Sequence, residues 1–266
     1  MTQKIQRRDF LTGSLAAGAA MATASQSASN SGPNNAAKQE LCELRIYRNT
    51  APSKQAVVLD FVENTLRDRL NHQGIDRIGI FKPADGKDAS VYLLIPYSSP
   101  DQLALQNDRL EQDRVYNKIA STYLSTSQKD PAYTRIESRL MRAFQGMPTV
   151  VPPPRKSPTR LVELRIYESH NERLAKLKVE MFNKGEIDVM REVGLGPVFF
   201  GETLISNDVP NLTYMLSADS EDAHKKHWSA FLKHPEWKRM SGLKRYKGTV
   251  SKIVSVFLTP TAASQL

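Results

Sequence analysis

Two short segments of this chain carry side chains whose types and spacing could do chemistry. A glutamate, an arginine and a tyrosine alternate within residues 43–47, and the same three types alternate within residues 163–167. An arginine beside a tyrosine can hold a carboxylate or an enolate through charged and neutral hydrogen bonds. A carboxylate whose pKa is raised can also move a proton. These two segments are therefore the first candidates for a binding or catalytic site.

The two segments belong to an internal repeat of the whole chain. The string Glu-Leu-Arg-Ile-Tyr occurs at residues 43–47 and again 120 residues later, and Gly74 and Gly194 keep that offset. The string Ser-Pro-Asp at 99–101 corresponds to Ser-Glu-Asp at 220–222 at an offset of 121. The chain therefore contains two copies of one unit of about a hundred residues, which is the size of a domain.

Each copy is expected to fold in the order β-α-β-β-α-β. In the first copy, strands are predicted near residues 41–48, 78–82, 91–96 and 135–142, and in the second near 161–167, 198–204, 212–216 and 250–258. This order is the ferredoxin-like unit, whose sheet carries both helices on one face and leaves the other face bare. We therefore expect an α+β fold in which two tandem ferredoxin-like halves pack sheet to sheet as a pseudo-dimeric α+β barrel.

The alternation of the first strand leads to an expectation about its two faces. Cys42, Leu44 and Ile46 form a purely apolar face, which we expect to pack against the helices. Arg45 and Arg165 would then point between the sheets, where each must pair with a glutamate because buried charges require partners. The partner would be either the glutamate two residues away on the same strand or one across the sheets. The interpretation as structural ion pairs and the interpretation as a ligand site both stay open.

A candidate pocket follows from this assignment of faces. Glu202 and Tyr214 lie on predicted neighbouring strands of the second copy. There they would join the arginines and tyrosines of the two alternating Glu-Arg-Tyr sets at 43–47 and 163–167, which we call the two triads. The predicted pocket residues are Arg45, Tyr47, Arg165, Tyr167, Glu202 and Tyr214.

The first 24 residues are predicted to be a twin-arginine signal peptide. Arg7 and Arg8 precede an Asp-Phe-Leu sequence and a small apolar run, and Ala22-Thr23-Ala24 offers a cleavage site. The apolar run is shorter than the roughly 20 residues of a membrane span, so no stable span is expected after cleavage. The protein is predicted to be exported, and thus periplasmic in a cell with two membranes.

The remaining boundaries follow from composition and from the repeat. We expect a disordered spacer at 25–39, the first domain at 40–146, a proline-rich linker at 147–159, the second domain at 160–259 and a tail at 260–266.

The net charge limits the kinds of ligand to be expected, and the cysteine content limits the possible disulfides. The formal net charge is +9, and it becomes +7 without the signal peptide, which holds three cations and one anion. The cations are interspersed with acids and no nucleic-acid motif occurs, so no nucleic-acid partner is predicted. An acidic ligand is compatible with this charge. The single cysteine, Cys42, permits no intrachain disulfide and is expected to fill a core position.

No metal or cofactor is predicted. His224 and His227 have the i, i+3 spacing at which two histidines can share a metal, but Lys225 and Lys226 between them would repel a cation. The two histidines are therefore interpreted as surface residues. The chain has no dinucleotide fingerprint and no nucleophile elbow. Haem stays open, because any of the five histidines could serve as an axial ligand.

Three motifs resemble the NIPSNAP family. They are Glu-Leu-Arg-Ile-Tyr on the first strand, Phe-Phe-Gly-Glu at 199–202 and His-Pro-Glu-Trp at 234–237. The second copy matches best, whereas the first has Ile-Phe-Lys-Pro at 80–83 in place of Phe-Phe-Gly-Glu. The resemblance implies the dimeric α+β barrel superfamily, which includes cofactor-free monooxygenases, small isomerases, haem enzymes and domains with no known reaction. It supplies no catalytic motif, and fold alone does not fix function.

Two functions follow as hypotheses. The first is the binding of a small acidic or amphipathic molecule, or of a partner, through the barrel interior. The alternative is a cofactor-independent enzyme of the monooxygenase or isomerase type, and the sequence does not decide between them. An enzyme requires a cavity of about 300 Å³ or more that reaches the candidate pocket residues. Further association of copies of the chain stays open.

Overall fold

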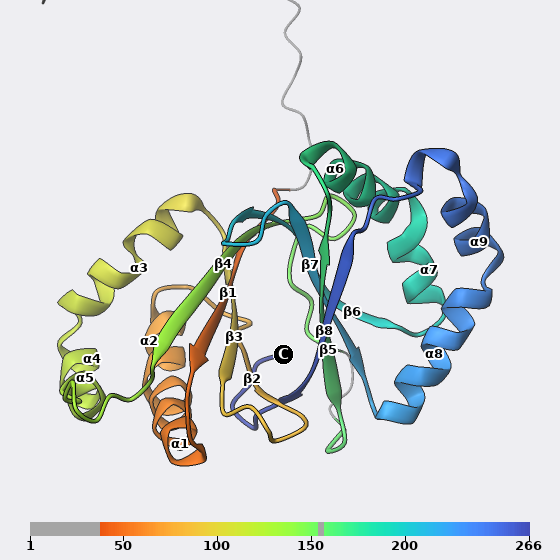
Figure 1. Cartoon of the computed structure of the whole chain (residues 1–266). Helices are drawn as coiled ribbons and strands as arrows, with labels where there is room; N and C mark the ends of the chain where they lie inside the picture. The colour runs from red at the N-terminus through yellow and green to blue at the C-terminus, as the bar shows by residue number, and fades with distance from the viewer. Residues whose placement is uncertain (1–37, 154–156) are drawn as a thin grey trace, which may run out of the picture. The chain divides into compact units, whose positions relative to one another are not determined.

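The computed structural model describes residues 38–153 and 157–266. The predicted signal peptide, most of the predicted spacer and residues 154–156 of the predicted linker lie outside the described residues. In Figure 1 the helices of the first half lie to the left of the strands and those of the second half to the right.

Each half follows the predicted order of elements, with the helices broken into shorter pieces. The first half contains β1 (Leu41–Arg48), α1 (Pro52–Phe61), η1 (Val62–Leu66), α2 (Arg67–His72), β2 (Gly79–Pro83), β3 (Val91–Tyr97), α3 (Pro100–Gln112), α4 (Arg114–Ile119), α5 (Ser121–Leu124) and β4 (Arg135–Ala143). The second half contains β5 (Leu161–Glu168), α6 (Glu172–Met181), η2 (Phe182–Glu186), α7 (Ile187–Glu192), β6 (Gly196–Ile205), β7 (Asn211–Ala218), α8 (Glu221–Lys233), α9 (Pro235–Gly242), η3 (Lys244–Tyr246) and β8 (Lys252–Pro260).

The strands form a closed antiparallel barrel in the order β1-β3-β2-β8-β5-β7-β6-β4. Each half contributes four neighbouring strands, in the order β4-β1-β3-β2 for the first and β6-β7-β5-β8 for the second. The halves meet along two seams, where β2 pairs with β8 and β4 pairs with β6. The predicted pseudo-dimeric α+β barrel of two ferredoxin-like halves is therefore confirmed.

The barrel interior is apolar over much of its length, and this overturns our assignment of faces. Cys42 and Leu44 point inward and join Leu164, Phe199 and Met215 in one buried cluster that draws on both halves. Their face was predicted to pack against the helices. Alternation shows which residues share a face, but it does not show which face lies inside when both are buried. The closed interior is filled by the purely apolar set, because an unpaired polar group there would be costly.

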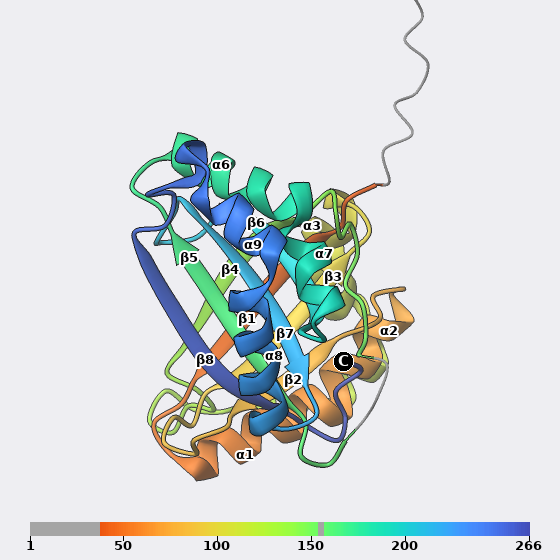
Figure 2. The same ribbon diagram turned by 90° about the vertical axis from the view of Figure 1, so that its right-hand side faces the viewer.

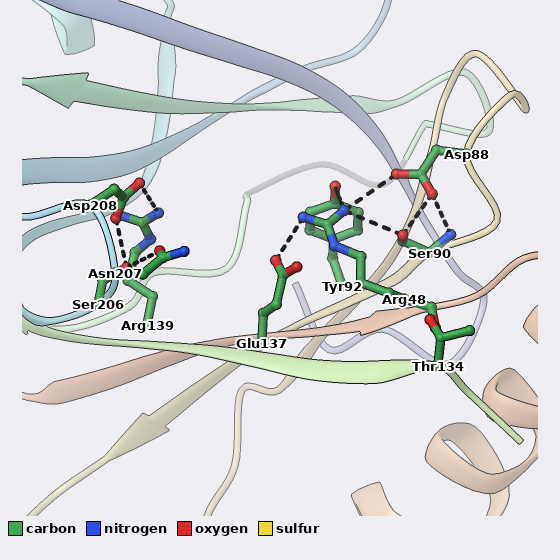
Figure 3. A network of polar contacts seen from close by, with 10 residues as sticks. All are labelled: Arg48, Asp88, Ser90, Tyr92, Thr134, Glu137, Arg139, Ser206, Asn207 and Asp208. Atoms are coloured by element: carbon green, nitrogen blue, oxygen red, sulfur yellow. Dashed lines mark hydrogen bonds and ion pairs between the residues drawn. The ribbon is translucent and has the colours of Figure 1, made fainter. Parts of the chain in front are cut away.

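Charged residues enter the interior-facing rows at one end of the barrel. Glu137 lies opposite Ile46 and Arg139 opposite Leu44, so both belong to the inward rows of β4. Figure 3 shows Arg48 beside Glu137, with 2.8 Å between Nη2 and Oε2, and Arg139 beside Asp208, with 2.7 Å between Nη2 and Oδ2. Asp208 belongs to the second half, so this second ion pair links the two halves across the β4–β6 seam.

The helices cover the outer face of the sheet. Figure 2 shows α8 and α9 in front of β5 and β7, with β8 at the side. Ile253 and Phe257 on the outer face of β8 are 50% and 42% exposed. In both halves the first long helix passes through a π-helical turn, η1 or η2, at the same place in the repeat. Among the described residues, no helix is long and apolar enough to cross a membrane.

The segment predicted as a tail packs against the first half. The amide of Thr261 donates to the carbonyl of Ile80, and the amide of Gln265 donates to the carbonyl of Ile78. Leu266 is buried among the interior residues. These bonds extend the β2–β8 seam beyond the last strand.

The β4–β6 seam generates a first prediction, at Gly201. A Cβ at this position would lie 2.7 Å from the ring of Phe199 and 2.8 Å from Cβ of Met141, which is closer than real Cβ contacts. We expect Gly201→Ala to lower the free energy of unfolding by about 1–3 kcal/mol through overpacking. Gly242→Ala is the matched control, because nothing lies within 4 Å of a Cβ there. Urea denaturation of the two variants measures both effects, and an equal effect of the two substitutions would contradict this account of the seam.

Candidate functional site: a cleft between the sheet and the helices of the first half

The first triad lies on the outer face of the barrel, beneath the helices. Arg45 donates to Glu43 twice, with Nε 2.9 Å from Oε1 and Nη2 2.8 Å from Oε2. Ser138 on β4 donates to Oε1 at 2.9 Å, and Tyr97 on β3 donates to Oε2 at 2.9 Å. The predicted pairing of Arg45 with a glutamate is therefore confirmed, and the partner is the one two residues away, although on the opposite face of the sheet.

The Glu43 carboxylate is fully engaged by these donors. Burial by itself raises the pKa of Glu43, but the charge of Arg45 and the hydrogen bonds from Arg45, Ser138 and Tyr97 outweigh burial and lower the pKa below its usual value. Glu43 is thus ionised at neutral pH and has little basicity. The bidentate contact uses Nε and Nη2 of Arg45 and leaves the Nη1 amino group outside the ion pair.

A cleft of about 370 Å³ opens in front of this ion pair, between β1 and β4 on one side and the helices on the other. Aromatic side chains form much of its wall. They are Tyr47, Phe61, Tyr116, Tyr123 and Tyr133. The rings of Phe61 and Tyr123 are stacked with their centroids 3.7 Å apart, and the rings of Tyr47 and Tyr133 meet edge to face at 5.5 Å.

The phenols of this wall are hydrogen-bond donors at neutral pH. Burial raises the pKa of Tyr47, Tyr116 and Tyr123 above the usual tyrosine value, so each keeps its proton. Together with the guanidinium of Arg45, they make the cleft rich in donors. Among the described residues, Glu43 is the one carboxylate that lines the cleft, and its oxygens already accept hydrogen bonds.

The second half has an equivalent buried carboxylate, Glu163, which is held by different donors. Arg165 Nη1 lies 2.7 Å from Glu163, and Ser255 takes the place of Ser138 at 2.6 Å. His224 Nε2 and Trp228 Nε1, both from α8, lie 2.8 and 2.9 Å from Oε2 of Glu163. The predicted pairing of Arg165 with its glutamate is thus confirmed as well.

Trp228 fills the space that is open in the first half. Its ring covers the guanidinium of Arg165 at 4.7 Å. Behind it, the hydroxyls of Tyr214 and Tyr167 are hydrogen-bonded at 2.9 Å, and Tyr214 is fully buried. Trp228 lies eight residues after Ser220, the N-cap of α8, and Asn107 lies eight residues after the corresponding N-cap of α3. Asn107 lines the open cleft, so a small side chain stands where the second half has a tryptophan.

The sequence profile of the NIPSNAP family matches residues 162–265. The second half of the chain is a NIPSNAP domain. The profile of the twin-arginine translocation signal matches residues 4–24, so the chain carries a signal for export by that route. No curated protein matches the sequence.

Solved structures resemble both halves together. A proposed monooxygenase from Lactobacillus acidophilus is 12% identical, aligns over 84% of this chain and 94% of its own, and gives a TM-score of 0.58. A second proposed monooxygenase, from Fusobacterium nucleatum, is 8% identical, aligns over 84% and 93%, and gives a TM-score of 0.55. A NIPSNAP-like domain protein from Burkholderia xenovorans is 18% identical, covers 39% of this chain and 87% of its own, and has a TM-score of 0.36. At these identities the likeness to the two proposed monooxygenases shows the barrel fold and nothing about activity.

The structure divides the predicted pocket into three places. Arg45 and Tyr47 line the open cleft, whereas Arg165, Tyr167 and Tyr214 lie together in the filled core of the NIPSNAP domain. Glu202 joins neither group. It pairs with Arg142 at 2.8 Å and with Lys176, beside a separate groove of about 350 Å³. The predicted convergence of these residues inside the barrel is therefore wrong, because the triads point outward.

The histidines of α8 also differ from the prediction. His224 is buried against Glu163 and is not a surface residue, whereas His227 is half-buried beside Gly194. Over residues 38–153 and 157–266, no three histidine, cysteine or acidic side chains gather as metal ligands would. The NIPSNAP domain also holds an ion pair that we did not predict. Lys178 and Glu186, both buried, lie 2.7 Å apart, and the ammonium of Lys178 is 4.7 Å from the ring of Phe182.

Reasoning from the sequence missed most of the cleft wall. Tyr123 and Tyr133 lie in a stretch where the two copies do not align, so the repeat gives no signal for them. Asn107 could have been predicted as a cleft residue, because the repeat offset of 121 aligns it with Trp228 in the sequence. The presence of an asparagine in one copy and a tryptophan in the other predicts that the two helices differ in a packing contact.

The carboxylate of the NIPSNAP domain generates a prediction about pH. Burial raises the pKa of Glu163, but hydrogen bonds from His224, Ser255 and Trp228 and the charge of Arg165 outweigh burial and lower the pKa to about 2. A lowered pKa contributes stability that is present above the unfolded value, about 4.3, and is lost as the pH falls towards about 2. We expect the free energy of unfolding to decline over this window, with a contribution from Glu163 on the order of 3 kcal/mol.

Chemical denaturation at a series of pH values measures this decline. Glu163→Gln removes the titrating group, so its curve should be flatter than that of the wild-type protein and the two should converge at low pH. Glu43→Gln is the counterpart in the first half and should flatten the curve in the same direction, because the pKa of Glu43 is also lowered. Parallel curves for wild type and Glu163→Gln would contradict the prediction.

Proposed function

We propose that the exported chain binds a small, planar, largely apolar molecule with a carboxylate or carbonyl oxygen, in the cleft of the first half. The observation that carries this proposal is the exchange of Trp228 for Asn107 at the same position of the repeat. It leaves the Arg45 side chain at the end of an aromatic cleft of about 370 Å³. That volume lies within the range of small-molecule sites, which are mostly apolar with few polar groups.

The side chains that line the cleft favour a ligand that carries a hydrogen-bond acceptor. The guanidinium and the protonated phenols are donors, and the one carboxylate is saturated by Arg45, Ser138 and Tyr97. A donor-rich and aromatic site favours a flat ring system that stacks on the tyrosines and presents an oxygen to Arg45. Aromatic acids meet both requirements.

The alternative of a cofactor-independent enzyme has weaker support. The resemblance to proposed monooxygenases concerns the fold. A base that removes a proton from a substrate must have free lone pairs and a suitable pKa. Glu43 has neither, because four hydrogen bonds hold its carboxylate and lower its pKa.

A plugged variant tests the proposed site. Asn107→Trp places in the first half the residue that fills the second, and Asn107 is exposed, so the substitution does not disturb the core. We expect 1-hydroxy-2-naphthoate to bind the wild-type protein with a Kd at or below about 1 mM, as the efficiency of ligands of this size implies. Asn107→Trp should weaken binding at least about tenfold, which corresponds to about 1.4 kcal/mol.

Isothermal titration calorimetry measures both affinities. Asp108→Trp is the matched control, because it adds the same ring at the next exposed position of α3, which does not line the cleft, and it should bind like the wild-type protein. Equal binding by wild type and a folded Asn107→Trp would place the site elsewhere. Absence of binding by the wild-type protein would refute an aromatic acid as ligand, and oxygen consumption with the bound compound would favour the enzyme.

A further inference from the structure

A second cavity lies beside the cleft in the first half. It has a volume of about 540 Å³ and lies between α1 and the helices α4 and α5. Phe61 and Tyr123 line both spaces, so their stacked rings form the wall between the cleft and the second cavity. We call this second space the outer cavity.

Apolar side chains that are exposed to solvent line the floor of the outer cavity. Val57 on α1 and Ile119 on α4 line it and are 40% and 49% exposed. Polar side chains stand at its rim, where Lys54 and Asp130 form an ion pair at 2.5 Å. An apolar floor with a polar rim is typical of sites that bury an apolar group.

The NIPSNAP domain shows what these two positions do when the space is filled. Val57 is the sixth residue of α1 and Leu177 the sixth of α6, and Ile119 and Met240 are the sixth residues of α4 and α9. Leu177 and Met240 pack together with Met181 in a small apolar core, where Met240 is 1% exposed. The same two positions are therefore core in one half and open in the other.

We propose that the ligand of the cleft carries an apolar chain, which passes the Phe61–Tyr123 pair and lies in the outer cavity against Val57 and Ile119. The inference rests on the proposed function, since it assigns the tail of a molecule whose head the cleft binds. The shared wall favours this occupant over a separate partner, because an apolar group that leaves the cleft past the Phe61–Tyr123 pair enters the outer cavity directly. The ligand class is then an amphipathic aromatic acid with an alkyl chain.

A homologous series of 6-alkylsalicylates, from methyl to decyl, tests the chain directly when it is used below micelle-forming concentrations. Each methylene that enters the outer cavity should improve the Kd by up to about fourfold, because burial of one methylene is worth roughly 0.8 kcal/mol. Ile119→Asp should leave the affinity for 6-methylsalicylate unchanged and remove most of the gain with chain length. Val115→Asp is the matched control, one turn earlier on α4, 52% exposed and outside both cavities, and it should keep the full gain.

The outcomes separate this inference from the proposed function. One outcome is that 6-methylsalicylate binds, that Asn107→Trp abolishes this binding, and that affinity does not rise along the series. This outcome would overturn the inference about the alkyl chain and leave the proposed binding in the cleft intact. A gain that Ile119→Asp does not change would also overturn it, because the chain would then lie elsewhere. A change in oligomeric state of Ile119→Asp, measured by light scattering, with an unaltered gain would assign the outer cavity to a second copy. No binding by any member of the series would refute the proposed function itself.

Discussion

A buried carboxylate that must be satisfied by donors fixes the arrangement of each half of this barrel. Glu43 takes hydrogen bonds from β1, β3 and β4 at once, through Arg45, Tyr97 and Ser138. These three strands are neighbours, so one side chain ties the sheet together under the helices. An ionised carboxylate left without these partners would cost several kcal/mol, so the surrounding residues are not free to vary independently. Because these donors lie on the helix-covered face of the sheet, the triads point outward, and the apolar residues of the same strands fill the interior.

The two halves use this common centre in different ways. In the NIPSNAP domain, His224 and Trp228 complete the centre from α8, and Trp228 also covers Arg165. In the first half, Tyr97 supplies the missing donor from the sheet, so the helix is released from that role. Asn107 can then stand at the mouth of a cleft without leaving the carboxylate short of a partner. Satisfaction of Glu43 from within the sheet is thus what allows the first half to stay open.

The fold could be predicted from the sequence, whereas the site could not. The repeat of residues 43–47 at 163–167, with Ser-Pro-Asp and Ser-Glu-Asp at matching places, was enough to predict two ferredoxin-like halves and their barrel. The direction of the triads was wrong because Cys42, Leu44 and Ile46 suit either a helix-covered face or a closed interior, and alternation does not distinguish them. The partners of the carboxylates come from other strands and from α8, so their roles depend on contacts that spacing does not reveal. Glu202 shares a face with Tyr214 but lies farther along β6, where it meets Arg142 and Lys176.

The central claim is that one half of the barrel keeps an open site which the other half has filled. A crystal structure of the exported chain with bound 1-hydroxy-2-naphthoate tests this claim most directly. The account predicts one molecule per chain, with its rings against Tyr116 and Tyr123 and its carboxylate within hydrogen-bonding distance of Arg45, and an undisturbed Trp228 over Arg165. Electron density for the compound inside the barrel or beside Arg165, or a first half whose helices have closed over Arg45, would contradict it.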